Sequence, residues 1–328
     1  MAPAVSAGVI SVGTWREADT TMDRVLSALT RLRGADQRGA VRASSLTLVA
    51  VGGEQIQVDD TFDTVHRLGV LQPTRVVVVR VVGRDRHRLD ARVGVHLQER
   101  GERCLSIDDV ALEVGGPVTD HLDSVVEPLT LSDLPIVMWC RERLPPARSR
   151  LIDLADHLVV DTARAGGASR LAALERLRAR VPVTDLAWLR LFPLRRRVAE
   201  AVRGRELLAR LDDVRSATAH GPGPEGLLLA SWLRCALPGT PVHHDEGDGD
   251  DEAAPLSVAL AGADWRLEVR HQGGCLSCRV DLEGQAPRAM AATAPSLQTE
   301  TLLGHVLLHL RPDPVYDRTL SAAAAQAG

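Results

Sequence analysis

The sequence predicts an α/β protein in which a mostly parallel, Rossmann-like sheet is covered by helices, followed by a smaller C-terminal α+β domain that contains an antiparallel sheet. An uninterrupted apolar run from Ile136 to Cys140 directly follows Pro135, which is typical of a strand buried on both faces. Apolar strands alternate with amphipathic helices four times between residues 46 and 181, and this alternation indicates a parallel sheet with helical crossovers. Residues 265–270 instead alternate apolar with polar side chains, as a strand with one solvated face does.

The first elements along the chain predict a strand–helix–strand unit. A helix is expected over 22–34, then a strand over 46–51, a helix over 59–71 and a strand over 75–82. The last of these is β-branched almost throughout, which is the composition of a central strand. Strand, helix and strand follow one another within about forty residues, so the crossover should be right-handed and the two strands parallel.

The middle of the chain shows shorter elements. The pattern predicts two peripheral antiparallel strands over 93–97 and 104–107 and two helices over 120–129 and 151–155. A strand over 158–160 and a further helix over 169–181 follow. Pro193 suits the first turn of another helix, with a buried stripe of Leu194, Val198, Ala201, Leu208 and Leu211. On that helix Arg196 points outward, and Arg195 and Arg197 flank the core.

The composition shifts at His220-Gly-Pro-Gly-Pro224, which indicates a domain boundary. A helix over 227–237, strands over 258–260, 265–270 and 277–282, and a last helix over 297–310 are expected beyond it. The predicted organisation is an N-terminal helical extension (1–40), an α/β domain (41–218) and a C-terminal α+β domain (219–328). Within the last domain we expect an acidic linker over 243–252 and a frayed tail after Tyr316.

Composition limits the class of protein. All 39 basic residues among the 328 are arginine, and lysine and asparagine are absent, which indicates a GC-rich bacterial genome and discounts every arginine cluster as a functional signal. A net charge of -4 argues against a nucleic-acid partner. No basic leader and no run of eighteen apolar residues occurs, so neither a signal peptide nor a membrane span is expected. Five cysteines do not form a disulfide framework. We expect a cytoplasmic protein in a reducing compartment.

The familiar cofactor and catalytic motifs are missing. No G-x-G-x-x-G follows a strand, a P-loop is impossible without lysine, and G-x-S-x-G is absent. No cofactor and no catalytic residue are therefore predicted. Cys275, Cys278, His305 and His309 look like a zinc set, but 26 residues separate the two pairs, against about 12–15 in finger-type sites. On one strand Cys275 and Cys278 would point to opposite faces, so no metal site is predicted, while a redox role for these two cysteines stays open.

Three segments share their order and spacing with a known family. They are Asp133-Leu-Pro-Ile-Val-Met-Trp139, Ala155-Asp-His-Leu-Val-Val-Asp-Thr162 and Asp185-Leu-Ala-Trp-Leu-Arg190. They resemble the D-L-P-x-x-x-W-W, A-D-x-x-x-x-D-S and D-L-x-W-x-R motifs of the OpcA family of glucose-6-phosphate dehydrogenase assembly proteins. The resemblance extends over residues 40–310. Upstream, Gln72-Pro-Thr-Arg75 is similar to the H-P-S-R turn of that family. The sequence departs from the family pattern at Cys140, Gln72 and Thr162, which replace a tryptophan, a histidine and a serine.

The resemblance implies a non-catalytic protein that binds glucose-6-phosphate dehydrogenase and promotes its active oligomer, and so supports NADPH production in the oxidative pentose phosphate pathway. Tryptophan and arginine dominate the binding energy of protein interfaces. The partner-binding or motif candidates are therefore Asp133, Leu134, Pro135, Trp139, Asp161, Asp185, Trp188, Arg190, Arg195, Arg196 and Arg197. The alternative is an enzyme that uses a sugar phosphate or sugar nucleotide, with Asp133 or Asp161 as a base or metal ligand, although aspartate at such positions commonly satisfies local backbone donors.

Overall fold

The computed structural model of the chain describes residues 9–35, 46–68, 74–83, 87–100, 103–131, 133–142, 144–146, 148–164, 169–247, 255–295 and 297–327. The chain forms two compact units. The first unit comprises residues 1–160, 178–183 and 303–310, and the second comprises residues 161–177, 184–302 and 311–328. The division into three domains over 1–40, 41–218 and 219–328, which the sequence suggested, stays a prediction.

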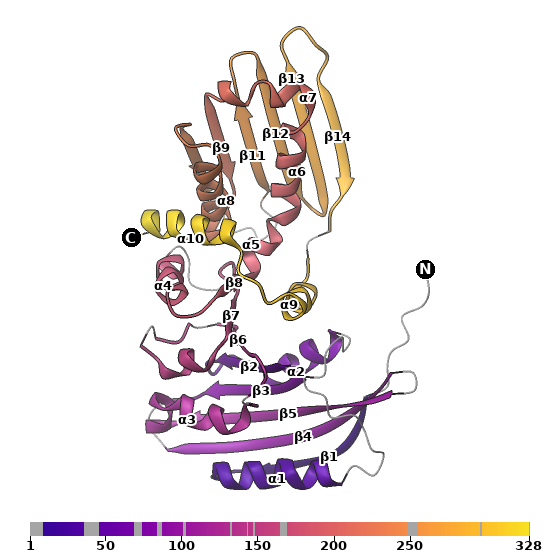
Figure 1. Cartoon of the computed structure of the whole chain (residues 1–328), viewed down its shortest axis with the longest axis vertical. Coiled ribbons are helices and arrows are strands. Elements are labelled where there is room, and N and C mark those ends of the chain that lie inside the picture. The colour runs from indigo at the N-terminus through magenta and orange to yellow at the C-terminus, as the bar shows by residue number, and fades with distance from the viewer. Residues whose placement is uncertain are drawn as a thin grey trace. The chain divides into compact units, whose positions relative to one another are not determined.

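The first sheet has eight strands in the order β1-β4-β5-β3-β2-β6-β7-β8 (Figure 1). Their bounds are β1 Val9–Glu17, β2 Leu46–Gly52, β3 Thr74–Val81, β4 Arg88–Arg100, β5 Arg103–Gly115, β6 Ile136–Cys140, β7 His157–Val160 and β8 Val183–Asp185. The neighbours from β5 through β3, β2 and β6 to β7 pair in parallel, and β4 pairs antiparallel with both β1 and β5. This confirms the predicted α/β class with a mostly parallel sheet.

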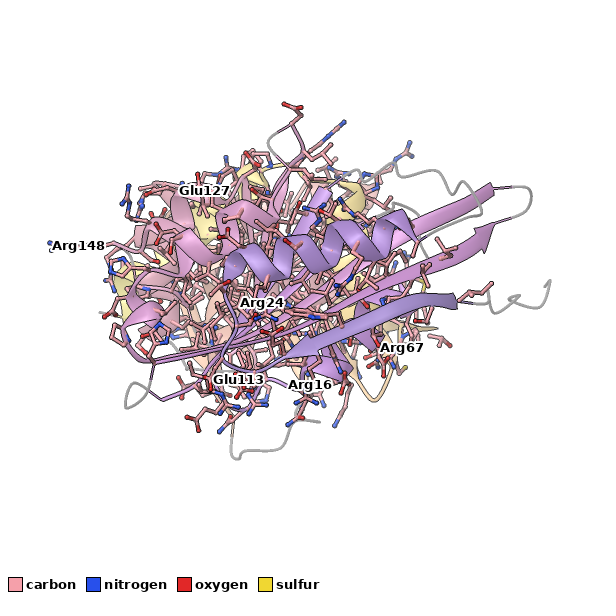
Figure 2. The ribbon with its side chains drawn as sticks, turned by 90° about the horizontal axis from the view of Figure 1, so that it is seen from below. Arg16, Arg24, Arg67, Glu113, Glu127 and Arg148 are labelled. Carbon is pink, nitrogen blue, oxygen red and sulfur yellow. The ribbon has the colours of Figure 1, made fainter. Side chains whose placement is uncertain are left out.

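Helices cover both faces of this sheet. Asp108 and Asp109 are consecutive on β5, so their side chains point to opposite faces. Asp108 receives Arg33 from α1 (Met22–Gly34), whereas Asp109 contacts His66 from α2 (Val58–Arg67). Figure 2 shows α1 lying across the strands, with Arg148 projecting outward at the rim. Strand β3 lies between the two layers, and its residues Val76 to Val79 are completely buried.

Three elements of the first unit differ from the sequence-based expectation. The strand β1 was not predicted, because its polar and apolar residues give a weak pattern, yet it pairs with β4 along nearly its whole length. The two short peripheral strands form one long hairpin, and β5 lies inside the sheet next to β3. The helix expected over 120–129 is broken into a short α3 (Leu122–Val126) and 3-10 turns, since Pro128 cannot continue the α-helical hydrogen bonding.

Other predicted elements of the first unit are present. The helix over 22–34 and the strands around 46–51, 75–82, 136–140 and 158–160 are found as expected. The short helix over 151–155 is a 3-10 turn, Arg150–Leu154. The predicted end of α2 at residue 71 lies outside the described residues. Among the described residues, no helix combines the length and the apolar character that crossing a bilayer requires.

The second unit contains a six-stranded sheet in the order β10-β9-β11-β12-β13-β14. Its strands are β9 Ser216–His220, β10 Val242–Asp245, β11 Leu256–Ala261, β12 Trp265–Gln272, β13 Cys275–Leu282 and β14 Arg288–Thr293. Among these strands β9 and β10 pair in parallel and the other neighbours pair antiparallel. The predicted antiparallel sheet is therefore present, with six strands in place of the three that were expected. Residues 243–245 of the predicted linker belong to β10, and 248–254 lie outside the described residues.

The helices of this unit are α4 Ser169–Arg178, α5 Leu186–Arg190, α6 Phe192–Val202, α7 Arg205–Leu208, α8 Gly223–Ala236 and α10 Pro314–Ala327. Helix α9 (Thr299–Leu308) begins in this unit, and its residues from 303 onward are counted with the first unit. Pro193 lies in the first turn of α6, as predicted. The helix ends at Val202, so Leu208 does not join its buried stripe and is 55% exposed. Helix α6 packs on β12 and β13 (Figure 1). The tail that was expected to fray instead forms α10, because alanine favours helix formation. Its residues Leu320 and Ala323 are buried, and the helix packs against α8.

Candidate functional site

Asp185 lies at the centre of the motif residues of the second unit. Its side chain is completely buried and accepts hydrogen bonds from the Ala187 amide (3.0 Å), the Thr162 amide (3.1 Å) and the Thr162 hydroxyl (2.6 Å). The Tyr316 hydroxyl approaches the same carboxylate at 3.4 Å. Burial raises the pKa of Asp185 to about 6, although the Thr162 hydrogen bonds oppose this change. Asp185 therefore caps α5 and ties β8 to the loop after β7.

Asp161 and Arg190 form the second feature of this cluster. The guanidinium of Arg190 donates to both carboxylate oxygens of Asp161, at 2.8 and 2.5 Å. Burial disfavours the charged guanidinium, but the hydrogen bonds and charge of Asp161 outweigh burial, so the pKa of Arg190 is raised. The more exposed Arg164 lies 3.6 Å from the same carboxylate. Both carboxylate oxygens of Asp161 are therefore bonded to Arg190, and Arg164 is a second cationic neighbour.

Trp188 is the third motif residue of the cluster. It is 1% exposed, and its indole N–H donates to Asp313 at 2.8 Å. The Arg195 guanidinium lies 3.3 Å from the centre of the indole ring and donates to the Trp188 carbonyl at 3.2 Å. Burial lowers the pKa of Arg195 to about 10. Trp188 and the α6 residue Arg195 therefore pack against each other on the inner side of α6.

Arg196 and Arg197 point differently from Arg195. The side chain of Arg196 is 65% exposed and pairs with Glu200, one turn along α6, at 2.7 Å. Arg197 is less exposed, lies 3.6 Å from Glu200 and contacts the Met290 sulfur on β14 at 3.8 Å. Phe192, four residues before Arg196, is 51% exposed and Met290 is 61% exposed. Phe192, Arg196 and Met290 are called the α6 face below.

The first motif belongs to the first unit. Asp133 and Pro135 are exposed, and the Pro135 carbonyl accepts a hydrogen bond from the Thr47 amide at 2.9 Å. The segment from Asp133 through Leu134 to Pro135 is the turn that leads into β6. Trp139 is 2% exposed, and the Arg141 guanidinium lies 5.0 Å from its ring centre. The tryptophan of this motif is therefore a core residue.

Cys275 and Cys278 both lie on β13 and are not disulfide-bonded. Cys275 is exposed and Cys278 is buried, as expected for residues three apart on one strand. Burial raises the pKa of the Cys278 thiol, which makes it less reactive. In the part of the chain that the structure describes, no group of three or more His, Cys, Asp or Glu side chains is placed to hold a metal ion.

A pocket of about 410 Å³ opens in the second unit next to Arg190. Its walls come from five loops and helix ends together with Leu256: 163–164, Arg190 with Pro193, 222–225, 271–273, and Pro295 with 297–299. Glu225, in the first turn of α8, lies 3.9 Å from Arg190. Burial raises the pKa of Glu225 to about 7 against the effect of Arg190, and the charges of Asp161 and Asp185 raise it further.

The residues that the sequence analysis missed come from distant parts of the chain. Glu225, Asp313 and Tyr316 meet the motif residues Arg190, Trp188 and Asp185 only through the tertiary fold. No spacing rule connects them, since more than thirty residues separate each pair. The proline and glycine residues around Glu225 did mark a turn, but a turn does not reveal a pocket.

The architecture defines a two-unit α/β protein, and comparison with known proteins supplies its family. Residues 65–179 match the model of the glucose-6-phosphate dehydrogenase subunit N-terminal domain, and residues 181–320 match that of the C-terminal domain. A relative from Nostoc punctiforme, an OxPP cycle protein OpcA, is 23% identical over 194 residues, which cover 56% of this chain and 42% of the relative. The chain belongs to the OpcA family. It matches less than half of the length of that curated relative.

The solved structures that the chain resembles are distant in sequence. The super-repressor mutant of Gal80p from Saccharomyces cerevisiae is 8% identical, with a TM-score of 0.43 and coverage of 81% of this chain and 84% of that one. The UDP-N-acetylglucosamine 3-dehydrogenase GnnA from Acidithiobacillus ferrooxidans is 10% identical, with a TM-score of 0.41 and coverage of 86% and 96%. The WlbA dehydrogenase from Bordetella pertussis is 10% identical, with a TM-score of 0.42 and coverage of 87% and 95%.

Proposed function

We propose that this protein is a non-catalytic assembly factor that binds glucose-6-phosphate dehydrogenase and promotes its active oligomer in the oxidative pentose phosphate pathway. The observation that carries this proposal is the match of two successive domain models, both described as glucose-6-phosphate dehydrogenase subunit domains, over residues 65–179 and 181–320. The relative from Nostoc punctiforme supports the same pathway, because OxPP is part of its name.

The occupation of the motif carboxylates supports a non-catalytic role. Asp161 is held in a two-pronged pair by Arg190, and Asp185 is buried under hydrogen bonds from Thr162 and Ala187. A general base must reach a substrate proton at hydrogen-bond distance. Asp161 is therefore not free to act as the base of the enzyme alternative, and Asp185 is not accessible to a substrate. Asp133, the other candidate base, is exposed in the turn before β6.

We assign the partner contact to the α6 face. Phe192 and Arg196 are one helical turn apart, so they share one side of α6, and Arg197 connects that side to Met290. An exposed aromatic ring, a methionine and an arginine are the residue types enriched at protein interfaces. Arg195 extends from the inner side of α6 over the Trp188 ring, so the role of these two residues in the contact is to support the surface.

The experiment uses glucose-6-phosphate dehydrogenase from the same organism. Its activity and native mass are measured with and without this protein, and we expect a rise in activity together with co-migration or a larger oligomer. The double variant Phe192→Ala, Arg196→Glu should weaken binding about thirtyfold or more, the loss typical of a hot spot. Arg266→Glu is the matched control, because Arg266 is exposed and alternates on β12 with the buried Trp265 and Leu267.

The outcomes separate the two parts of the proposal. If the wild-type protein neither binds nor activates the dehydrogenase, the assigned function is wrong. If the α6-face variant unfolds at the wild-type temperature and still binds with unchanged affinity, the function stands and the α6 face is not the contact. Loss of binding in Arg266→Glu alone would instead place the partner on the opposite face of the sheet.

A further inference from the structure

The pocket beside Arg190 is built from polar side chains that converge from separate segments. Arg190 is fixed by Asp161, and its guanidinium also lies 3.5 Å from the Thr299 hydroxyl. The Arg164 side chain is 58% exposed and lines the same pocket. The pocket volume of about 410 Å³ is within the range of small-molecule sites, roughly 300–1,000 Å³.

Arg164 and Arg190 give one side of the pocket a cationic character. The guanidinium of Arg190 is oriented by its ion pair, and that of Arg164 is directed by its 3.6 Å approach to Asp161. An arginine guanidinium presents a fork of donors that matches a phosphate or carboxylate. The first turn of α8 contributes the backbone N–H groups of Gly223 and Glu225, which have no acceptor inside the helix, and both residues line the same pocket.

The remaining wall offers neutral donors and acceptors. Gln272, Gln298 and Thr299 supply two amides and a hydroxyl. His271 Nε2 lies 2.7 Å from the Ala294 carbonyl, so Nε2 carries a hydrogen and donates to that carbonyl. Such a set hydrogen-bonds hydroxyl groups from several directions.

Glu225 adds a carboxyl group whose protonation is balanced near neutral pH. Its pKa of about 7 arises from burial and from the nearby carboxylates. The protonated form can donate to a ligand hydroxyl and does not repel an anion, whereas the ionised form repels an anion. A ligand that carries both hydroxyl groups and one anionic group therefore suits this pocket.

We infer that the pocket binds a small polyhydroxylated anion, namely a sugar-like molecule with one phosphate or carboxylate group. Arg164 and Arg190 contact the anionic group, and the amide, hydroxyl and carboxyl side chains contact the hydroxyl groups. This inference goes beyond the proposed assembly role, because it concerns the isolated protein and needs no dehydrogenase.

The test is calorimetric titration of the full chain at pH 7 with glucose 6-phosphate, glucuronate, glucose and inorganic phosphate. The two sugar anions should bind, and glucose and inorganic phosphate should bind about tenfold more weakly or worse, since each lacks one half of the recognised group. Binding of only one of the two sugar anions supports the inference and identifies the anionic group. Absence of binding by both overturns it.

Variants connect the binding to this pocket. Arg164→Ala should weaken the sugar anion about tenfold or more, the usual loss for a hydrogen bond to a charged group, without lowering the unfolding temperature of the ligand-free protein. Arg266→Ala, on another part of the sheet, is the control and should bind normally. Unchanged affinity in Arg164→Ala would overturn the assignment even if the wild-type protein binds.

Glucuronate provides a second readout because its own carboxylate does not titrate near pH 7. Its affinity for the wild-type protein should fall as the pH rises from 6 to 8, since Glu225 ionises in that interval. Glu225→Gln should remove this dependence. A pH dependence that persists in Glu225→Gln contradicts the placement of the ligand next to this carboxyl group. Activation of the dehydrogenase can be measured separately, so failure here leaves the assembly role standing.

Discussion

Arg190 holds Asp161 in a two-pronged ion pair, with nitrogen–oxygen distances of 2.8 and 2.5 Å, at the edge of the polar pocket of the second unit. Both residues were motif candidates in the sequence, and the structure places them in direct contact. Arg190 ends α5 and Asp161 follows β7, so the pair joins two segments that the sequence separates by 29 residues.

The Asp161–Arg190 pair should be strongly coupled. Removal of one partner leaves a largely buried charge, so Asp161→Asn and Arg190→Met should each lower the free energy of unfolding by about 3 kcal/mol. The double variant should lose less than the sum of the two, because neither charge is then left alone. Urea unfolding of the four proteins measures the coupling. Additive losses would show that the contact contributes little.

The ionisation of Asp185 should make the protein less stable as the pH rises from about 4 to 6. The folded pKa of about 6 lies above the ordinary value of 3.8, so the folded state keeps a proton that the unfolded state has released, and stability falls across that window. The loss amounts to at most about 3 kcal/mol, because each pKa unit is worth about 1.4 kcal/mol. Asp185→Asn should flatten this part of the stability profile.

Urea unfolding at several pH values between 4 and 8 tests this expectation, and Asp133→Asn serves as a control because Asp133 is exposed in a turn. The pH profile of the control should follow that of the wild-type protein. An Asp185→Asn profile parallel to that of the wild-type protein would mean that Asp185 is ionised throughout.

The contact of Asp109 with His66 should also stabilise the first unit less as the pH rises, in a higher pH range than the Asp185 effect. It lies 3.0 Å from His66 and 3.2 Å from His96, and its hydrogen bond raises the pKa of His66 above 6.5. Stability from protonated His66 is fully present below pH 6.5 and is lost as the pH rises through the folded pKa. Asp109→Asn should therefore cost about 3 kcal/mol near pH 6 and clearly less at pH 9.

The same urea titrations measure the Asp109 effect. His121→Gln, a change at an exposed histidine, is the control and should leave the profile unchanged. A cost of Asp109→Asn that is equal at pH 6 and pH 9 would exclude an ionic contribution from His66.

Trp188 should act as a structural residue of the second unit. Trp188→Ala removes a large buried ring and should cost about 3–5 kcal/mol. Trp188→Phe keeps most of the ring but leaves Asp313 without the indole donor, so it should cost about 1–3 kcal/mol. Thermal unfolding ranks the two variants. A Trp188→Ala protein of wild-type stability that fails to bind the dehydrogenase would instead assign Trp188 to the contact.

The sequence by itself determined the α/β class, the strands around Leu46, Val76, Ile136 and Leu158, and the family. These features rest on local patterns, because the period of apolar residues reports which side of an element is buried. The same dependence on local patterns explains why the sequence predicted only a short peripheral strand over 104–107, where the structure has the long inner strand β5. Asp108 and Asp109 look like solvent-exposed residues in the sequence, but partners from α1 and α2 compensate their charges in the core.

Only the tertiary structure decided which candidate residues are exposed and which groups meet. Trp139 and Trp188 are buried, and Arg195 and Arg196 differ although they are adjacent, because consecutive residues on α6 face the core and the solvent. The pocket joins residues from Ala163 to Thr299, a span over which no periodicity extends. Contacts of that range depend on how strands and helices pack, and packing is a property of the whole chain.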